Sequence, residues 1–114
     1  MTTTVPLGVF NVGDVWEQPL QIQVTGTDMS GVVVACSILR PDNTKLALTG
    51  LTPTFIDDPD NTTFSVVLAL TAAQTIEIGP GPVSGDVVIE KAGFGPYTPV
   101  RFTFDLKNRI TPNP

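Results

Sequence analysis

The chain has 114 residues, of which 41% are hydrophobic and only 15% charged, so the composition predicts one folded domain and excludes a disordered chain. Eleven acidic residues against six basic ones give a net charge of −5, which disfavours binding to nucleic acid or to an anionic membrane. There is no His and one Cys, so the side chains of most hydrolytic centres, of zinc sites and of an internal disulfide are missing. We therefore expect no enzyme activity and no cofactor.

No apolar run of the sequence approaches the roughly 20 residues that a helix needs to cross a bilayer. Val32–Cys36 and Val66–Leu70 are examples of the longer runs. The N-terminal residues lack the basic and apolar regions of an export signal. The sequence therefore predicts a soluble protein that is not exported.

Frequent Thr and Val residues, broken by ten Gly and eleven Pro, predict many short strands joined by turns. After a first edge strand around Leu7–Val12, the residues from Trp16 to Val24 alternate between apolar and polar, which is typical of a strand with one face in the core. Trp16 is on the core face of this pattern. Pro19 cannot donate a backbone hydrogen bond, so we expect this strand at a sheet edge or with a bulge.

The next strand, Val32–Arg40, begins apolar on both faces, as expected of a strand that is central or that meets a partner. Cys36 lies among its valines and is expected to be a small buried hydrophobic residue. The segment Arg40–Asn43 has the Pro-Asp chemistry of a tight turn. We therefore expect a hairpin with Lys45–Thr49.

A strongly alternating strand, Phe64–Leu70, leads into a helix start. Thr71 and Gln74 have the spacing of a capping box, and two alanines between them favour a helix. We expect a single helical turn, because Ile76 and Ile78 resume a strand-like alternation.

The last two strands are predicted at Val83–Lys91 and Tyr97–Lys107, with a Gly-rich connection between them. A short extended piece, Thr52–Asp57, brings the total to seven or eight strands. This number and spacing favour an all-β, immunoglobulin-like antiparallel sandwich of two sheets. We divide the chain into an N-terminal arm and first edge strand (1–12), the β-sandwich domain (13–107) and an extended C-terminal tail (108–114).

Both ends of the chain are expected to be ordered only by a partner. The segment Thr2–Pro6 is β-prone but too short and polar to pack as a core strand. The tail Asn108–Pro114 contains two prolines, which keep it extended without a ladder of its own. We expect one or both arms to lie along neighbouring subunits.

Oxygen-bearing side chains crowd together at Asp57, Asp58, Asp60 and Asn61, and calcium prefers such ligands. The same residues also suit a solvated turn around Pro59, and their spacing lacks the Gly and the distal Glu of an EF-hand loop. We therefore predict a turn and no metal site, with a calcium site as the alternative.

Aromatic side chains offer one candidate contact surface. Phe94 and Tyr97 lie in the Gly/Pro-rich connection between the last two strands, where amphipathic rings could stack on a sugar. Trp16 is less suited to this role, because its position in the strand pattern places it in the core.

Several segments resemble one known family of virion proteins. They are Gly13–Trp16, Asp28–Val34, Leu70–Thr75 with its Leu-Thr-Ala-Ala-Gln-Thr sequence, and the final hairpin Gly85–Lys91 with Val100–Leu106. Together they are similar to the immunoglobulin-like sandwich proteins of tailed-bacteriophage virions, such as the N-terminal domain of phage baseplate upper proteins. The resemblance covers about Gly13 to Lys107.

The resemblance implies a structural role in a phage particle, with no catalytic residues. We expect a capsid decoration subunit or a tail or baseplate accessory, located in the virion and bound to other virion proteins and to copies of itself. The alternative is a receptor- or glycan-binding module that presents the loop from Phe94 to Tyr97. The residues expected to contact partners are Thr2, Thr3, Thr4, Val5, Pro6, Phe94, Tyr97, Arg109, Ile110 and Pro112.

Overall fold

The computed structural model describes residues 2–56 and 60–110. Within these residues the chain forms eight strands and one short helix. The elements are β1 (Thr3–Asn11), β2 (Trp16–Gln23), β3 (Val33–Leu39), β4 (Lys45–Ala47), β5 (Thr54–Phe55), β6 (Thr63–Leu70), α1 (Ala72–Ile78), β7 (Gly81–Lys91) and β8 (Phe94–Lys107).

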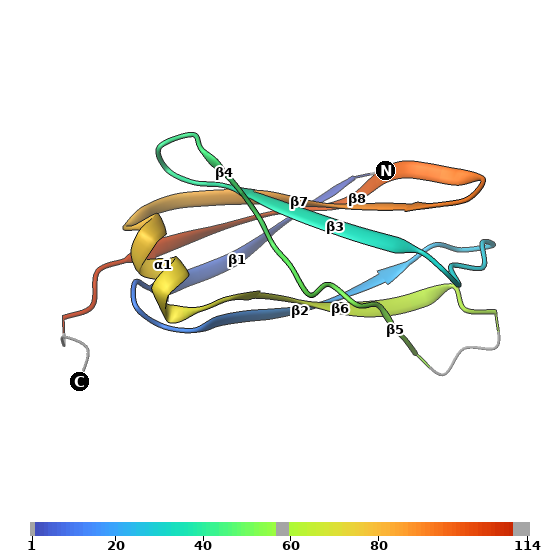
Figure 1. Ribbon diagram of the computed structural model, residues 1–114, viewed down its shortest axis with the longest axis horizontal. Helices are drawn as coiled ribbons and strands as arrows, with labels where there is room; N and C mark the ends of the chain where they lie inside the picture. The colour runs from blue at the N-terminus through green and yellow to red at the C-terminus, as the bar shows by residue number, and fades with distance from the viewer. Residues whose placement is uncertain (1, 57–59, 111–114) are drawn as a thin grey trace.

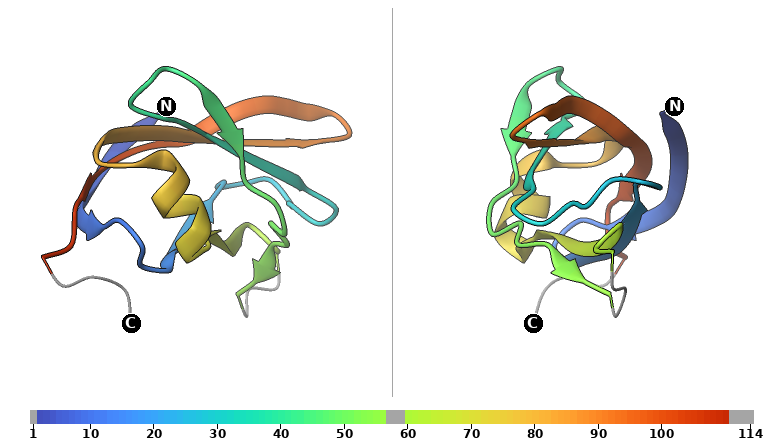
Figure 2. Two further views of the ribbon diagram at one scale, coloured as in Figure 1. Left: turned by 60° about the vertical axis from the view of Figure 1, so that its left-hand side comes forward. Right: turned by 90° about the vertical axis from the view of Figure 1, so that its right-hand side faces the viewer.

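The strands form two sheets that pack face to face (Figure 1). One sheet has the strand order β1-β8-β7-β3-β4, and the other has the order β2-β6-β5. Figure 2 shows the two layers from two further directions, and Figure 1 shows α1 at one end of the sandwich. This arrangement is that of an immunoglobulin-like domain, in which strands two, six and five oppose the sheet built on the last hairpin. The predicted all-β sandwich is confirmed.

Strand β1 departs from the antiparallel pattern of the other pairs. It runs parallel to β8, with Val5 opposite Phe102, and the register shifts between Pro6 and Val9. Gly8 lies within this shift at a φ of 103°, a conformation that favours glycine. The N-terminal strand therefore forms an edge of the larger sheet with a bulge in its middle.

The expectation that the N-terminal arm needs a partner to become ordered is wrong for the residues that enter β1. Backbone pairing with β8 begins at Thr3, and the Thr2 hydroxyl donates a hydrogen bond to the Thr98 carbonyl at 2.7 Å. The physical reason is that the backbone groups of β8 on this side need partners, and a β-prone segment of the same chain supplies them.

The core lies between the sheets and is built around stacked aromatic rings. Trp16 is 2% exposed, which confirms the predicted burial, and its ring stacks on Phe104 with centroids 4.7 Å apart. Phe102 stacks on Phe104, and Phe10 meets Trp16 edge to face. These four rings come from β1, β2 and β8, so they join the two sheets.

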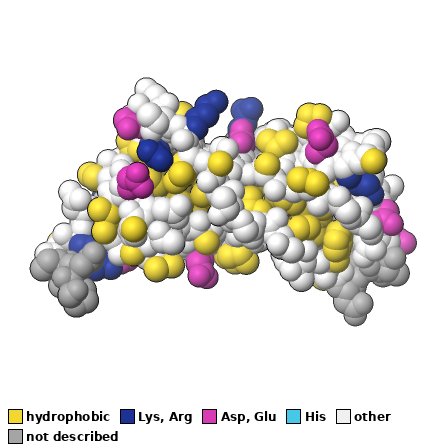
Figure 3. All heavy atoms as spheres, in the orientation of Figure 1, with side chains coloured by type: hydrophobic (Ala, Val, Ile, Leu, Met, Phe, Trp, Pro, Cys, Tyr) yellow, Lys and Arg dark blue, Asp and Glu magenta, His cyan; other side chains and the backbone are white. Residues whose placement is uncertain are grey.

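Aliphatic side chains complete the core along both sheets. Figure 3 shows hydrophobic side chains along the middle of one broad face, between the two layers, where the segment joining β4 to β5 crosses. The buried aliphatic and sulfur-containing residues are Ile22, Met29, Val32, Val34, Cys36, Ile38, Leu48, Val66, Leu68, Leu70, Val83, Val87, Ile89 and Leu106.

Two strand predictions are settled by the sheet order. Strand β2 pairs only with β6 and is therefore an edge strand, as Pro19 predicts. Strand β3 is central, between β7 and β4, but it is covered on one face only. Val34 is buried, whereas Val33 is 66% exposed and Leu39 36% exposed. The outer face of β3 is thus open to a partner.

The turns and the helix follow their local chemistry. The hairpin of β3 and β4 forms as predicted, with Asn43 at a φ of 69° in its turn. The capping box at Thr71 and Gln74 is present, and each residue bonds the backbone of the other. The helix extends to Ile78, so the prediction of a single turn is wrong. Ile78 packs against the core whereas Ile76 is 53% exposed, because residues two apart lie on nearly opposite sides of a helix.

Candidate functional site

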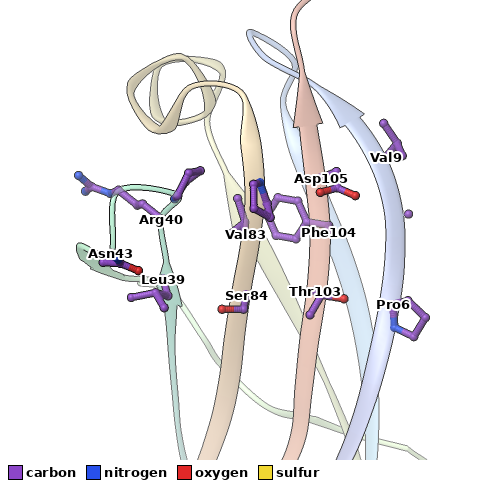
Figure 4. A pocket seen from close by; sticks show the side chains of 13 residues that line it. Pro6, Val9, Leu39, Arg40, Asn43, Val83, Ser84, Thr103, Phe104 and Asp105 are labelled. Carbon is purple, nitrogen blue, oxygen red and sulfur yellow. The ribbon is translucent and has the colours of Figure 1, made fainter.

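A groove runs across the outer face of the five-stranded sheet. The sheet registers place Leu39, Ser84, Thr103 and Pro6 side by side on β3, β7, β8 and β1. Figure 4 shows these side chains standing in a row across the sheet. With strands about 4.8 Å apart, the groove is about 14 Å wide from β3 to β1.

The groove consists of two adjoining hollows of about 480 and 530 Å³, which share Leu39, Ser84 and Thr103. The hollow at the β3–β4 turn is bounded by Val9 on the far side. The residues of this first hollow are Pro6, Gly8, Val9, Leu39, Arg40, Pro41, Asn43, Pro82, Val83, Ser84, Thr103, Phe104 and Asp105.

Alternation along the strands explains why this face is hollow. Phe102 and Phe104 point into the core, at 0% and 3% exposure, so β8 presents its shorter polar side chains outward. Ser84 and Thr103 form the floor, while Leu39 stands on one wall. The result is a floor of hydroxyl groups between taller, partly apolar walls.

Two opposite charges stand at the centre of the second hollow. Asp86 on β7 is the register partner of Arg101 on β8, and Ser37 and Thr4 flank them on the neighbouring strands. Such a cross-strand pair leaves little net charge on the floor. The groove is therefore suited to a protein surface of mixed polarity rather than to a strongly charged ligand.

The hydroxyl groups of Ser84 and Thr103 on the groove floor have no hydrogen-bonded base in the described part of the chain. No hydrogen bond from Ser84 or Thr103 to a carboxylate or amine base is seen there, and the sequence has no His. Across residues 2–56 and 60–110 no group of three or more His, Cys, Asp or Glu side chains is placed to hold a metal ion. The arrangement can position a partner through shape and hydrogen bonds.

The predicted N-terminal contact residues contribute directly to this groove. Pro6 lines the first hollow and Thr4 the second, and both are exposed. Thr2 and Thr3 are also exposed, whereas Val5 is half-buried on the other face of β1. The part of the arm that pairs within the chain thus still presents side chains outward.

The predicted aromatic pair lies at the tip of the β7–β8 hairpin. Phe94 and Tyr97 meet edge to face with centroids 6.1 Å apart. Both rings are half-buried and pack against the core, while Gly95 and Pro96 between them are exposed. The structure therefore brings the two rings together, away from the four residues that span the groove.

Arg109 and Ile110, two of the predicted C-terminal contact residues, lie at the opposite end from this hairpin tip. Arg109 donates a hydrogen bond to the Gly13 carbonyl at 3.3 Å and forms an ion pair with Asp14. Ile110 is 102% exposed. Pro112 lies outside the described residues, so its predicted role stays a prediction.

The residues of the predicted turn, which are also those of the alternative calcium site, are described only in part. Asp57 and Asp58 lie outside the described residues, while Asp60 and Asn61 precede β6. Asn61 adopts a φ of 50° and its side-chain amide donates to the Ser30 hydroxyl at 3.0 Å. This geometry suits the predicted turn; both the turn and the calcium alternative stay predictions.

Cys36 is buried in β3, as predicted, and burial decides its chemistry. Desolvation raises the pKa of the thiol to about 12, and the negative charge of Asp86 acts in the same direction. The thiol is therefore protonated at neutral pH and is a poor nucleophile.

Sequence reasoning missed the groove itself. The outward residues of each strand are visible in the alternation, but the groove depends on β1 and β8 lying side by side, and these strands come from the two ends of the chain. Parallel pairing of β1 was not indicated by any local pattern. No helix in the described residues is long and apolar enough to cross a membrane.

Comparisons with known proteins identify the fold and no family. Neither a protein-family profile nor a curated protein matches the chain. A family 123 glycoside hydrolase from Clostridium perfringens, studied for glycolipid glycan hydrolysis, is similar with a TM-score of 0.62 and 13% identity, covering 97% of this chain and 23% of that one. An amylomaltase from Corynebacterium glutamicum has a TM-score of 0.55 and 12% identity, covering 92% of this chain and 12% of that one.

An internalin-like protein of Listeria monocytogenes also matches, with a TM-score of 0.38, 14% identity, and coverage of 95% of this chain and 29% of that one. The chain thus spans less than a quarter of the hydrolase and of the amylomaltase. At these identities the first two similarities show the sandwich fold alone.

Proposed function

We propose that the chain is a non-enzymatic structural component of a tailed-phage virion, either a capsid decoration subunit or a tail or baseplate accessory. It acts by contacts with neighbouring subunits. The observation that carries this proposal is the groove, a hollowed sheet face of short polar side chains between partly apolar walls. The resemblance of Gly13 to Lys107 to phage sandwich proteins supports the assignment to a virion.

The sheet edges favour contact through faces over strand addition. Edge strand β1 carries Pro6 and a bulge, and edge strand β2 carries Pro19. Edge strands β4 and β5 have three and two residues. Prolines, bulges and short strands are the devices that prevent edge-to-edge pairing, so the broad outer faces are the better surfaces for a partner.

The proposal is tested by placing a long charged side chain on the groove floor. Thr103 is exposed in the middle of the floor, so Thr103→Arg should leave the melting temperature unchanged and block docking. We expect incorporation into phage particles to fall about tenfold or more, which corresponds to about 1.4 kcal/mol of binding free energy.

Gln21→Arg is the matched control, because Gln21 is also exposed but lies on the outer face of the other sheet. This variant should fold and incorporate as the unaltered protein does. Normal incorporation of Thr103→Arg would contradict the groove as the contact surface. Failure of the unaltered protein to incorporate into any particle would contradict the virion role.

A second candidate function is a receptor- or glycan-binding module, favoured by the edge-to-face pair of Phe94 and Tyr97 at the hairpin tip. Aromatic rings stack on sugars, and the similar glycoside hydrolase acts on glycolipid glycans. Tyr97→Ala distinguishes the two functions. Loss of adsorption to host cells with normal incorporation indicates the binding module, whereas normal adsorption supports the structural role.

A further inference from the structure

Three exposed aliphatic side chains come from segments that lie at one end of the sandwich. Val15 is 66% exposed, Ile76 is 53% exposed and Ile110 is 102% exposed. They come from the β1–β2 turn, from α1 and from the segment after β8, and Figure 1 shows these three segments at the same end of the molecule. We call these three residues the apolar end. Exposed apolar side chains on segments at the same end of a protein are a candidate contact surface.

Hydrogen bonds hold two of the three segments together beneath the apolar end. The buried Thr75 hydroxyl of α1 accepts from the Gly13 amide at 3.0 Å and lies 2.9 Å from the Asp14 carbonyl, to which it donates. Val15 follows directly in this turn, and Ile76 follows Thr75 in the helix. The turn and the helix are therefore fixed relative to each other.

The third segment is fixed to the same turn by Arg109. Its guanidinium donates to the Gly13 carbonyl at 3.3 Å and pairs with the Asp14 carboxylate. Ile110 follows directly and points into solvent. The apolar end is thus a built surface in which one small turn anchors both the helix and the C-terminal segment.

A hollow lies directly beside the exposed Ile110. It has a volume of about 540 Å³ and is lined by Asn11, Asp14, Lys107, Asn108, Arg109 and Ile110. A protruding side chain next to a hollow can be self-complementary in a two-fold contact, because each copy can insert its side chain into the hollow of the other.

The charges of this end are also self-complementary. Asp14 and Arg109 neutralise each other within the chain. Glu77 on α1 and Lys107 at the end of β8 are exposed, and neither takes part in an ion pair across residues 2–56 and 60–110. Because Glu77 and Lys107 have opposite charges and make no ion pair with each other, a two-fold rotation can place each opposite the other.

We infer that the apolar end binds the same end of a second copy of this chain in a two-fold contact. Val15, Ile76 and Ile110 form its centre, and Glu77 meets Lys107 of the second copy at its rim. The surface differs from the groove, so a virion subunit could use the groove for a neighbour and this end for pairing. The inference stands without the proposed function.

The available area suits such a dimer. The molecule measures 47 × 27 × 20 Å, and the end lies across the longest axis. Its full cross-section, spanned by the two shorter extents of 27 and 20 Å, limits the area that two copies can bury to about 1,000 Å² in total, which is the lower bound for a specific interface. We therefore expect a reversible dimer rather than a permanent one.

Sedimentation equilibrium of the full chain, from about 1 µM to about 500 µM, tests the inference. The unaltered protein should pass from monomer to dimer within this range. Val15→Asp, Ile76→Asp and Ile110→Asp should each raise the dissociation constant about tenfold or more. Ile110 lies beyond the last strand, so its variant should retain the unaltered far-UV spectrum and melting temperature.

Val33→Asp is the matched control, because Val33 is as exposed as Val15 but lies on the outer face of β3. It should dimerise normally. The rim is tested by Glu77→Lys and Lys107→Glu, each of which should weaken the dimer, while the double variant should restore it. The inference is overturned if the unaltered protein remains a monomer at every concentration. It is also overturned if Val33→Asp weakens the dimer while Ile110→Asp does not.

Discussion

The ring of Phe102 occupies the place that a side chain on Gly85 would take. The two residues are register partners on β7 and β8, and a Cβ atom on Gly85 would lie 2.4 Å from Cζ of Phe102 and 2.9 Å from the Ser37 carbonyl oxygen. Gly85 is therefore required by packing, because an aromatic ring of the core approaches its backbone closely.

Gly85→Ala should accordingly destabilise the fold by about 1–3 kcal/mol, the usual effect of overpacking a core. Urea unfolding followed by the fluorescence of Trp16 measures the change. Ser84→Ala, one residue earlier and facing outward, should change the free energy of unfolding by less than about 0.5 kcal/mol. Equal stability of the Gly85 variant and the unaltered protein would contradict the close approach.

Trp16 joins the two sheets, and its removal should open a large cavity. The side chain is 2% exposed and stacks on Phe104 at 4.7 Å. Trp16→Ala should therefore destabilise the protein by about 3–5 kcal/mol. In the unaltered protein the emission of Trp16 should lie at the short wavelength of a buried indole, with a β-type far-UV spectrum. Emission at the wavelength of free tryptophan would contradict the sandwich.

Thr75 is a polar residue at 0% exposure, and its hydroxyl forms a hydrogen bond with the backbone of another segment. It accepts from the Gly13 amide at 3.0 Å. Thr75→Val keeps the shape and leaves this buried amide without its acceptor, so the free energy of unfolding should fall by about 1–3 kcal/mol. Thr75→Ser, which keeps the hydroxyl, should be the more stable of the two variants when both are unfolded in urea.

Acid should weaken the fold through carboxylates whose pKa values are lowered. The hydrogen bond from Arg109 holds the pKa of Asp14 below its ordinary value of 3.8, and bonds from Ser30 and Thr44 do the same for Asp28 and Asp42. A lowered pKa gives stability that is present above 3.8 and lost as the pH falls through the folded-state pKa.

Melting temperatures measured from pH 7 to about pH 2 should therefore be level down to about pH 5 and fall below it. Asp14→Asn removes one of the three carboxylates, so its melting temperature should depend less steeply on pH in the acid range. An unchanged acid dependence in this variant would show that the pair with Arg109 contributes nothing to stability. High salt provides a second check, because exposed ion pairs are screened.

Local patterns predict local features of this chain well. The parity that Trp16 shares with Ile22 places both in the core, and the capping residues Thr71 and Gln74 start α1 where the sequence indicates. The turn at Asn43 also forms as its chemistry requires. In each case the deciding interaction lies within a few residues of the pattern, so one segment carries the information.

Features that depend on distant strands could not be predicted in this way. The contact of Gly85 with Phe102 follows from the β7–β8 register, and the groove follows from β1 lying beside β8. The apolar end joins Val15, Ile76 and Ile110 from three segments. The periodicity of one segment does not indicate which other segments will lie beside it. These surfaces can therefore be identified only in the folded chain.

The last prediction concerns the N-terminal segment. Its short, polar sequence indicates that it needs a partner subunit to become ordered, but it pairs with β8 of its own chain. Thr3, Thr4 and Val5 lie opposite Val100, Arg101 and Phe102 on β8. Deleting residues 1–5 removes these partners and leaves part of β8 as an unprotected edge. We therefore expect a lower melting temperature and, at high protein concentration, aggregation through the exposed edge.

A matched truncation separates this effect from a general loss of chain. Removing residues 110–114 leaves every strand and the Arg109 pair intact, so its melting temperature should equal that of the full chain. Replacing Thr3 and Thr4 by Val keeps the backbone ladder and should also preserve stability, since β-branched residues suit a strand. If the protein without residues 1–5 melts at the same temperature as the full chain, pairing of these residues with β8 contributes no stability. In the full chain the segment would then be free to bind a neighbouring subunit.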